Sequence, residues 1–406
     1  MPDQKRILIL TADAGFGHRS AANAIAEALQ EKHGSECVYE IVNVLDDEHT
    51  PRLLRDSQSD YDRIARDMPD VYKFGYEATD ANAAAGLMER GLQAMLYSPL
   101  SRLLNDKQPD AIISTFPLYQ APLGAVFSIT KKFIPLVAVV TDLVTVHQIW
   151  FSEYPDLTVV PTEVVRELAI GAKVPAEQIE VIGIPVHPRL LKETRAKAAI
   201  RAELGWDPNL ATILMVGSKR SSLYVDVANV LNHSGLPVQL MVATGGDDEH
   251  YAELQRTEWH RPAHVYNFVK NMPTMMRAAD CIICKAGGLT VTESLASGLP
   301  LMLTDVIPGQ ETGNAEYVVN GGAGEMIDEP LKALETVCHW LLNDGALLKE
   351  RAANAAKLGR PRAAYDIVDR AWMLAQRGPV AKEAEQILFL PRLIEMFQRF
   401  GVKTEG

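Results

Sequence analysis

A histidine follows two glycines near the amino end of the chain, in the segment 11–29, TADAGFGHRSAANAIAEAL. Gly15 and Gly17 stand where a phosphate-binding turn between a strand and a helix needs them, and Ser20 replaces the third glycine. His18 would then lie at the helix start, where the helix dipole disfavours a charged imidazolium. A neutral imidazole there is suited to general base catalysis, and a capping or phosphate-contacting histidine is the alternative.

A second glycine turn lies in the segment 284–318, CKAGGLTVTESLASGLPLMLTDVIPGQETGNAEYV. Gly287 and Gly288 allow a tight turn after a buried strand, and the helix expected over 289–297 would offer its free N–H groups to an anion. We expect Glu293 in the first turn of that helix, where its carboxylate would accept hydrogen bonds from two vicinal hydroxyl groups, as acidic residues do on a ribose.

The next strand, 301–304, leads into a polar loop and another helix. Gln310, Glu311 and Asn314 supply the donors and acceptors that suit the hydroxyl groups of a sugar. A helix cap with solvated polar side chains is the alternative interpretation. Because these residues converge with the glycine turn at the carboxyl ends of parallel strands, the pattern favours a binding site.

Three further residues follow the strand expected over 136–141. Asp142 is a second candidate for accepting a proton, and a turn cap is its alternative role. His147 and Trp150 either line a pocket for the acceptor molecule or pack in the core.

Short apolar runs alternate with helical segments along the whole chain, which predicts an α/β protein with two doubly wound parallel sheets in tandem. We expect domains at 1–190 and 191–380, and a helix over 381–406 that packs back on the first domain. The expected strands are 6–11, 37–44, 111–115, 136–141, 157–160 and 179–182, and then 211–216, 239–243, 264–266, 281–284 and 301–304.

Composition excludes several classes of protein. The chain has 406 residues and a formal charge of -12, which argues against a nucleic-acid partner. No apolar run reaches the roughly 18 residues of a spanning helix, and no signal peptide is apparent, so we expect a cytoplasmic protein. Cys281 and Cys284 form a C-x-x-C pattern within a buried strand, where their thiols would point to opposite faces and hold no metal.

The segment 70–105 is rich in large apolar residues. A helix packed on the sheet is one interpretation, and an acceptor groove or membrane-docking face is the other. The candidates for the second role are Phe74, Tyr76, Met95 and Tyr97, with the lysines Lys73, Lys131 and Lys132.

The segment 284–318 resembles the donor-binding region of family 28 glycosyltransferases, a group that includes monogalactosyldiacylglycerol synthases and processive diacylglycerol glucosyltransferases. The segment 15–29 resembles the amino-terminal turn of the same group, and TDLVTVHQIWF, residues 141–151, resembles a strand-end segment that its lipid-modifying members carry. The similarity covers most of the chain and is least informative over 45–105 and the last 30 residues.

The resemblance implies a GT-B fold, in which two Rossmann-like domains face each other across a cleft. It implies that the carboxyl-terminal domain binds a UDP-sugar and that the amino-terminal domain binds the acceptor. His18 is then the base, and the turn that contains Gly17 contacts the departing diphosphate. The other donor contacts it implies are Gly287, Gly288, Leu289, Thr290, Gly217 and Ser218 for the diphosphate, Glu293 for the ribose, Phe268, Val269 and Met272 for the uracil, and Gly309, Gln310, Glu311 and Asn314 for the hexose.

The activity implied is transfer of a hexose, galactose or glucose with galactose favoured, from the UDP-sugar to the hydroxyl group of diacylglycerol with inversion at the anomeric carbon. No D-x-D motif lies at a strand end, so we expect no metal and no other cofactor. The lipid acceptor implies that the protein associates peripherally with a membrane surface. Anionic lipids are the partners expected there.

Other activities are compatible with parts of the pattern. Family 28 also contains N-acetylglucosaminyl transferases that act on a lipid-linked precursor, and UDP-sugar epimerases share the architecture. An NAD-dependent oxidoreductase would use Asp46 or Asp47 after the second strand, but it lacks the third glycine and leaves 284–318 unexplained. A nucleotide-sensing protein without turnover would have no need of His18 and Glu293.

Overall fold

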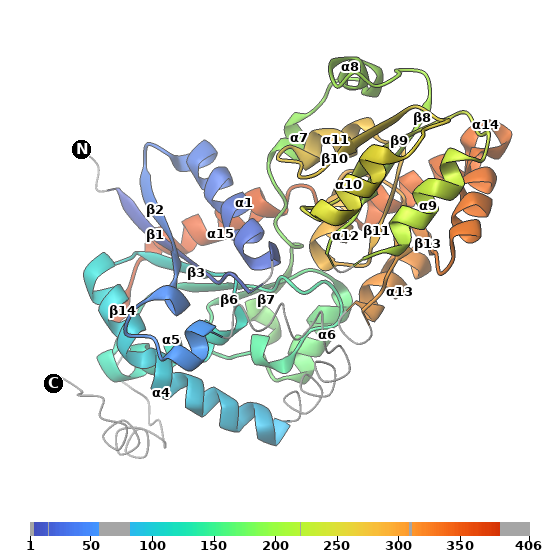
Figure 1. The fold of residues 1–406 in the computed structure, drawn as a ribbon. Helices are drawn as coiled ribbons and strands as arrows, with labels where there is room; N and C mark the ends of the chain where they lie inside the picture. The colour runs from blue at the N-terminus through green and yellow to red at the C-terminus, as the bar shows by residue number, and fades with distance from the viewer. Residues whose placement is uncertain (1–3, 15, 57–81, 220, 308–310, 382–406) are drawn as a thin grey trace. The chain divides into compact units, whose positions relative to one another are not determined.

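The computed structural model describes residues 4–14, 16–56, 82–219, 221–307 and 311–381. Contacts divide the chain into two units: unit 1 comprises Met1–Pro185 with Ala363–Gly406, and unit 2 comprises Val186–Arg362. Each unit has its own six-stranded sheet with helices packed on it (Figure 1). The two doubly wound α/β sheets predicted from the sequence are therefore confirmed.

The sheet of unit 1 has the strand order β2-β1-β3-β5-β6-β7, and all its strands are parallel. The strand order reverses between β1 and β3, and such a point creates a crevice at the carboxyl ends of the two strands. The strands are β1 (Lys5–Thr11), β2 (Cys37–Asn43), β3 (Ala111–Ser114), β5 (Leu136–Val139), β6 (Leu157–Val160) and β7 (Ile179–Val181).

Helices cover both faces of this sheet because successive residues of its strands, which point to opposite faces, are apolar and buried. Ile7 and Ile9 pack with α1 (Phe16–His33) and α15 (Ala363–Arg377) in one core. Leu8 and Leu10 pack in a second core with α4 (Asn82–Lys107) and α5 (Gln120–Thr130). The remaining elements of unit 1 are α6 (Glu163–Gly171), the short pair β4 (Lys132–Phe133) and β14 (Val380–Ala381), and the 3-10 helices η1 (Val44–Asp46), η2 (Pro117–Tyr119), η3 (Gln148–Trp150) and η4 (Ala176–Gln178).

The helix α15 belongs to unit 1, which differs from the expectation that 363–380 completes the second domain. Its apolar stripe, which includes Ile367, Val368 and Ala371, is fully buried in the core that contains Ile7 and Ile9. Hydrophobic burial therefore assigns the helix to the first sheet, although it follows unit 2 in the sequence. The helix expected over 381–406 lies almost entirely outside the described residues.

The sheet of unit 2 has the order β10-β9-β8-β11-β12-β13, again with all strands parallel. This is the order of a dinucleotide-binding sheet, and its reversal point lies between β8 and β11. The strands are β8 (Ala211–Val216), β9 (Val238–Ala243), β10 (Ala263–Tyr266), β11 (Cys281–Lys285), β12 (Leu301–Thr304) and β13 (Gly324–Met326).

The core of unit 2 includes the buried faces of β8, β9 and β11 together with two helices. One of these is α9 (Leu223–Asn232), and the other, α14 (Pro330–Leu358), is interrupted at Leu342–Gly345, where three residues have positive φ. The other helices are α7 (Arg189–Lys192), α8 (Lys197–Glu203), α10 (Asp248–Arg256), α11 (Met272–Ala278), α12 (Gly288–Ala296) and α13 (Thr312–Asn320).

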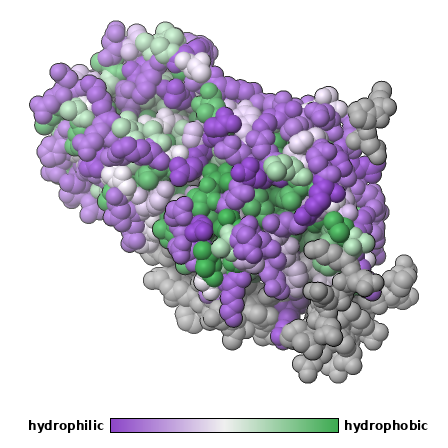
Figure 2. Space-filling view, turned by 180° about the vertical axis from the view of Figure 1, so that it is seen from behind, coloured by the Kyte–Doolittle hydropathy of each residue, from purple (hydrophilic) through white to green (hydrophobic). Residues whose placement is uncertain are grey.

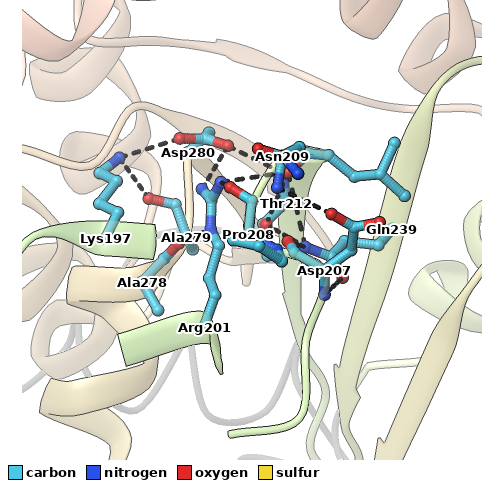
Figure 3. Close-up of polar contacts among 11 residues, drawn as sticks. Lys197, Arg201, Asp207, Pro208, Asn209, Thr212, Gln239, Ala278, Ala279 and Asp280 are labelled. Atoms are coloured by element: carbon cyan, nitrogen blue, oxygen red, sulfur yellow. Dashed lines mark hydrogen bonds and ion pairs between the residues drawn. The ribbon is translucent and has the colours of Figure 1, made fainter. Parts of the chain in front are cut away.

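A polar network anchors α8 beside the amino ends of β8 and β11 (Figure 3). The buried Arg201 donates to Asp280 Oδ2 at 2.6 Å and to the carbonyl oxygen of Ala278 at 2.8 Å. The same Asp280 oxygen accepts from the backbone N–H of Thr212 at 2.8 Å. The network therefore lies at the amino ends of the strands, on the side of the sheet away from their carboxyl ends.

The two cysteines of the C-x-x-C pattern lie in β11, and both are buried free thiols. Cys281 packs in the core that contains α9 and α14, whereas Cys284 is outside it. Burial raises the pKa of both thiols, that of Cys284 to about 12. Within the described residues, no group of three or more His, Cys, Asp or Glu side chains could hold a metal ion.

The face shown in Figure 2 is largely hydrophilic, with apolar side chains gathered in places between the polar ones. The large apolar side chains with the greatest exposure include Leu53, Phe268 and Met373. None of the described helices is long and apolar enough to cross a membrane.

Candidate functional site

His18 lies in the first turn of α1, at the reversal point of the first sheet. Its Nδ1 is 2.9 Å from the carbonyl oxygen of Thr115, just after β3, and 2.8 Å from the hydroxyl oxygen of Thr141, after β5. The ring also packs edge-on against Phe116, with centroids 5.0 Å apart. The carboxyl ends of β1, β3 and β5 thus fix the orientation of one imidazole ring.

These contacts define which ring nitrogen carries the proton. A carbonyl oxygen only accepts hydrogen bonds, so Nδ1 must donate to Thr115. In the neutral ring, Nε2 then holds a lone pair, and no described residue donates a hydrogen bond to it. A base whose other nitrogen is oriented by a fixed acceptor is the arrangement that proton abstraction requires.

Burial lowers the pKa of His18 to about 4, although the hydrogen bond to Thr115 opposes this shift. The side chain is therefore neutral at physiological pH. Gly17, one residue earlier, is partly exposed, and a Cβ there would meet no described atom within 4 Å. Its backbone N–H belongs to the first turn of α1, where N–H groups lack partners within the helix.

Asp142 bonds to an indole ring that lies near the same imidazole. Trp150 Nε1 donates to Asp142 Oδ2 at 2.6 Å, and the Trp150 ring centroid lies 6.0 Å from that of His18. Burial raises the pKa of Asp142 to about 6, while the indole hydrogen bond lowers it. The two candidate proton acceptors thus belong to one cluster in unit 1.

His147 and Trp150, predicted as possible linings of an acceptor pocket, are buried in unit 1. Trp150 is 1% exposed, and His147 Nδ1 accepts from the backbone N–H of Ile149 at 3.1 Å, so that it caps η3. The packing interpretation therefore holds for both: His147 shapes the turn that carries Trp150, and Trp150 orients Asp142.

The membrane-docking prediction for Tyr97 is corrected in the same way. Tyr97, a residue of α4, is 7% exposed and packs in the core between this helix, α5 and the sheet. Burial raises the pKa of its phenol. Met95 packs at the edge of that core and is partly exposed. Phe74, Tyr76 and Lys73 lie outside the described residues.

In unit 2, the predicted glycine turn follows β11 at the reversal point of the second sheet. Gly287 is the N-cap of α12 and Gly288 its first residue, and no side chain caps the helix. Gly287, Gly288, Leu289 and Thr290 are all partly exposed. The amino end of α12 therefore offers open N–H groups, as an anion site requires.

Glu293 is in the second turn of α12, because the helix begins at Gly288 and has no acidic residue in its first turn. This corrects the expected placement. The side chain is partly buried, no described residue pairs with it, and burial raises the pKa of its carboxyl group to about 7. A partly buried carboxyl group that no described residue pairs with is suited to a ligand with hydroxyl donors.

The predicted hexose residues that the structure describes lie beside this turn. The buried Glu311 contacts Lys285, the last residue of β11, and accepts from the backbone N–H of Ile307 at 3.1 Å. Asn314 donates to the carbonyl oxygen of Ala286 at 3.0 Å. Gly309 and Gln310 are outside the described residues.

The loop after β8, where Gly217 and Ser218 are the expected diphosphate contacts, is tightly packed. The backbone N–H of Gly217 donates to the carbonyl oxygen of Ala243, and a Cβ on Gly217 would lie 2.3 Å from the Tyr224 ring. Gly217 is thus required by packing, and its N–H is already used. Ser218 is partly exposed and bonds through its backbone N–H to Ser221 Oγ.

The expected uracil segment lies between β10 and α11. Phe268 is 69% exposed, and Val269 and Met272 are partly exposed. The loop is tied to the β9 end because Gly246 N–H donates to the carbonyl oxygen of Asn267 at 3.0 Å.

Sequence reasoning missed Thr115, Thr141 and Lys285 as members of the two sites. Each stands at the carboxyl end of a buried strand or within two residues after it, which was the available signal. Asp305, after β12, was missed too: it has φ of +48°, and its Oδ2 is buried without a hydrogen-bond partner among the described residues. Strained backbone and unpaired polar atoms are commonly found at binding sites.

Comparison with known proteins identifies both halves of the chain. Residues 18–186 match the family model of monogalactosyldiacylglycerol (MGDG) synthase, and residues 212–367 match that of the glycosyltransferase family 28 C-terminal domain. Monogalactosyldiacylglycerol synthase from Spinacia oleracea is 33% identical over 376 residues, which cover 90% of this chain and 71% of that protein. Monogalactosyldiacylglycerol synthase 1 from Arabidopsis thaliana is 32% identical, with 90% and 70% covered.

Solved structures share the fold at low identity. MurG from Acinetobacter baumannii aligns with a TM-score of 0.58 at 17% identity, covering 91% of this chain and 100% of that one. A UDP-GlcNAc 2-epimerase from Neisseria meningitidis, bound to UDP-GlcNAc, aligns with a TM-score of 0.56 at 15% identity, covering 91% and 100%. The predicted GT-B fold is confirmed, and on the level of sequence the chain belongs to the monogalactosyldiacylglycerol synthase family of glycosyltransferases.

Proposed function

We propose that the protein transfers a hexose from a UDP-sugar to the hydroxyl group of diacylglycerol with inversion at the anomeric carbon, and that galactose is preferred over glucose. Family membership supports the reaction class, and the names of its relatives support galactose and diacylglycerol. The observation that carries the proposal is His18, whose Nδ1 is fixed on Thr115 so that Nε2 is a free base.

In the proposed mechanism, Nε2 of His18 takes the proton of the acceptor hydroxyl group as its oxygen bonds to C1 of the hexose. The bond between C1 and the UDP oxygen breaks, and its electron pair leaves with the diphosphate. A low pKa keeps the imidazole neutral, so the base is available at every physiological pH. Asp142 is the alternative base, and its hydrogen bond from Trp150 favours a structural role.

The donor would bind to unit 2. The amino end of α12 suits the diphosphate, since its N–H groups are uncapped and partly exposed. Glu293 suits the ribose, because no described residue pairs with its carboxyl group, and burial raises the pKa of that group. The same N–H groups would stabilise the diphosphate that departs, so we propose that transfer needs no metal ion.

We further propose that the enzyme works at a membrane surface, because its acceptor is a lipid. Met95 and the lysines Lys131 and Lys132 are the described candidates for this contact; Lys132 also donates to Gln108 Oε1 at 2.5 Å. Co-sedimentation with anionic vesicles should exceed that with zwitterionic ones and should fall when both lysines become glutamine. Equal binding to both vesicles, or the same loss with the exposed control Lys173→Gln, would contradict this contact.

The decisive experiment is release of UDP by the purified protein. Diacylglycerol in mixed micelles is offered with UDP-galactose or UDP-glucose, in the presence of a chelator. We expect lipid-dependent release, faster with UDP-galactose, that falls about 10²–10⁴-fold in His18→Ala. His49→Ala is the control, since His49 is an exposed histidine of the same unit that bonds to Asp47.

Other outcomes point elsewhere. Loss of activity with chelator that added metal restores would overturn metal independence. Release only with UDP-N-acetylglucosamine and a lipid-linked precursor would reassign the acceptor within family 28. A change in nicotinamide absorbance would indicate an oxidoreductase, and the absence of turnover with every donor would indicate a sensor.

A further inference from the structure

Lys285 and Glu311 form an ion pair directly beside the glycine turn of unit 2. The ammonium group contacts Glu311 Oε1, and the two side chains are 20% and 6% exposed. The other carboxylate oxygen, Oε2, accepts from the backbone N–H of Ile307 at 3.1 Å. Glu311 is thus fixed by the backbone, while Lys285 is held by Glu311.

The position of this ammonium group is unusual for a helix start. Its Nζ lies 3.1 Å from the point that a Cβ on Gly287 would occupy, and Gly287 is the N-cap of α12. The amino end of a helix carries a partial positive charge, so a cation there is unfavourable unless an anion lies beside it. Glu311 supplies that anion within the protein, and it does so where the helix would bind a ligand anion.

Unused hydrogen-bonding capacity surrounds the pair. An ammonium group has three donors, and Glu311 is the one partner of Lys285 among the described residues. Thr304 lies beside Lys285 in the register of β12 and β11, and its buried hydroxyl group has no described partner. Asn314 is 4% exposed and reaches the turn through Ala286, yet its Oδ1 also lacks a described partner.

We propose that Lys285 is a catalytic residue that binds the diphosphate, and that Glu311 binds the Lys285 ammonium group until the donor arrives. On binding, Lys285 leaves Glu311 for an oxygen of the β-phosphate. The freed Glu311 carboxylate then accepts a hydrogen bond from the hexose. As the bond from C1 to the UDP oxygen breaks, the Lys285 ammonium neutralises the charge that develops on that oxygen, which is work that a metal ion does in other enzymes.

This exchange rests on the proposed function, because it requires a UDP-sugar at α12. It predicts that substitutions of the two partners change the affinity for UDP in opposite directions. Removal of Lys285 takes away the phosphate ligand, whereas removal of the Glu311 charge takes away its competitor. If the ion pair were purely structural, both substitutions would change UDP affinity in the same direction.

The test is titration calorimetry of the full chain with UDP and with uridine, which lacks phosphate. In Lys285→Gln we expect UDP affinity to fall about tenfold to a hundredfold, while uridine affinity changes less than about twofold. In Lys285→Arg, which keeps the charge, most of the UDP affinity should return. In Glu311→Gln we expect tighter UDP binding together with slower lipid-dependent transfer. Lys349→Gln, a change to an exposed lysine on α14, is the matched control.

The outcomes separate the two proposals. If the unaltered chain binds neither UDP nor uridine, the proposed function fails and the exchange fails with it. If it binds UDP and Lys285→Gln binds equally well, or loses uridine to the same extent, the exchange alone is overturned. Weaker UDP binding in Glu311→Gln also overturns it, and this variant decides the matter if Lys285→Gln does not fold.

Discussion

At the scale of single residues, the proposed function depends on titratable groups that are only partly accessible to water. The imidazole of His18 is neutral because burial lowers its pKa, and the carboxyl groups of Asp142 and Glu293 hold protons more tightly because burial raises theirs. Each group is therefore shifted toward its uncharged form, which is the usual effect of desolvation. These shifts make the roles of the residues distinguishable by pH.

The pH profile of kcat/KM should identify the base. A base works in its unprotonated form, so the rate rises with pH through the pKa of the base and is constant above it. With His18, whose pKa is about 4, the rate should be constant from pH 6 to 8 and fall only well below pH 6. A midpoint near pH 6 that disappears in Asp142→Asn would instead identify Asp142, whose pKa is about 6.

Glu293→Gln should raise the stability of the protein at high pH and weaken UDP binding. The pKa of Glu293 is higher in the folded state than in the unfolded one, so its contribution to stability is full below about pH 4.5 and is lost as the pH rises through about 7. At pH 8 the neutral glutamine avoids this loss, and we expect the free energy of unfolding to rise by about 1–3 kcal/mol. UDP binding should weaken at the same pH.

Urea denaturation at pH 5 and pH 8, with calorimetry of UDP binding, measures both effects of Glu293→Gln. The gain in stability should be large at pH 8 and small at pH 5. An equal gain at both values would show that the charge of Glu293 is not the cause.

At the scale of elements, the network in Figure 3 holds unit 2 together at the edge away from the proposed site. Arg201 is buried and bonds to Asp280 and to three backbone carbonyl groups, so Arg201→Ala leaves several buried groups unpaired. We expect this variant to lose about 3–5 kcal/mol of unfolding free energy. The Lys197 side chain is half exposed and contacts the same Asp280, so Lys197→Ala should cost at most about 1 kcal/mol. Denaturation curves that show the same loss of unfolding free energy in both variants would contradict this difference between Arg201 and Lys197.

The elements themselves were largely predictable from the sequence. Buried parallel strands are short runs of apolar residues, and strands such as 157–160, 211–216 and 301–304 were predicted with the bounds that the structure has. The edge strand β13, Gly324–Met326, was missed because three residues that include a glycine and a glutamate carry no such signal.

The candidate sites were predictable where they follow strand ends and not where they depend on packing. His18 and the Gly287 turn were found because glycines mark a strand-to-helix turn. The burial of Tyr97 and Trp150 was not decided, since an apolar side chain suits a core and a lipid surface equally well. The contact between Lys285 and Glu311 joins the last residue of β11 to the N-cap of α13, and no local pattern in the sequence reports such a pair.

At the scale of the whole molecule, the chain leaves unit 1 after Pro185 and returns to it with Ala363. Unit 2 is therefore one continuous segment with its own core, and a fragment 186–362 should fold alone, melt cooperatively and bind UDP. A fragment 1–185 should not, because it lacks α15 and leaves the apolar face around Ile7 and Ile9 in water. Joining residues 363–381 to it through a flexible linker should restore a cooperative melt, measured by circular dichroism. If 1–185 alone melts at the same temperature as the joined fragment, α15 is not required for the first sheet.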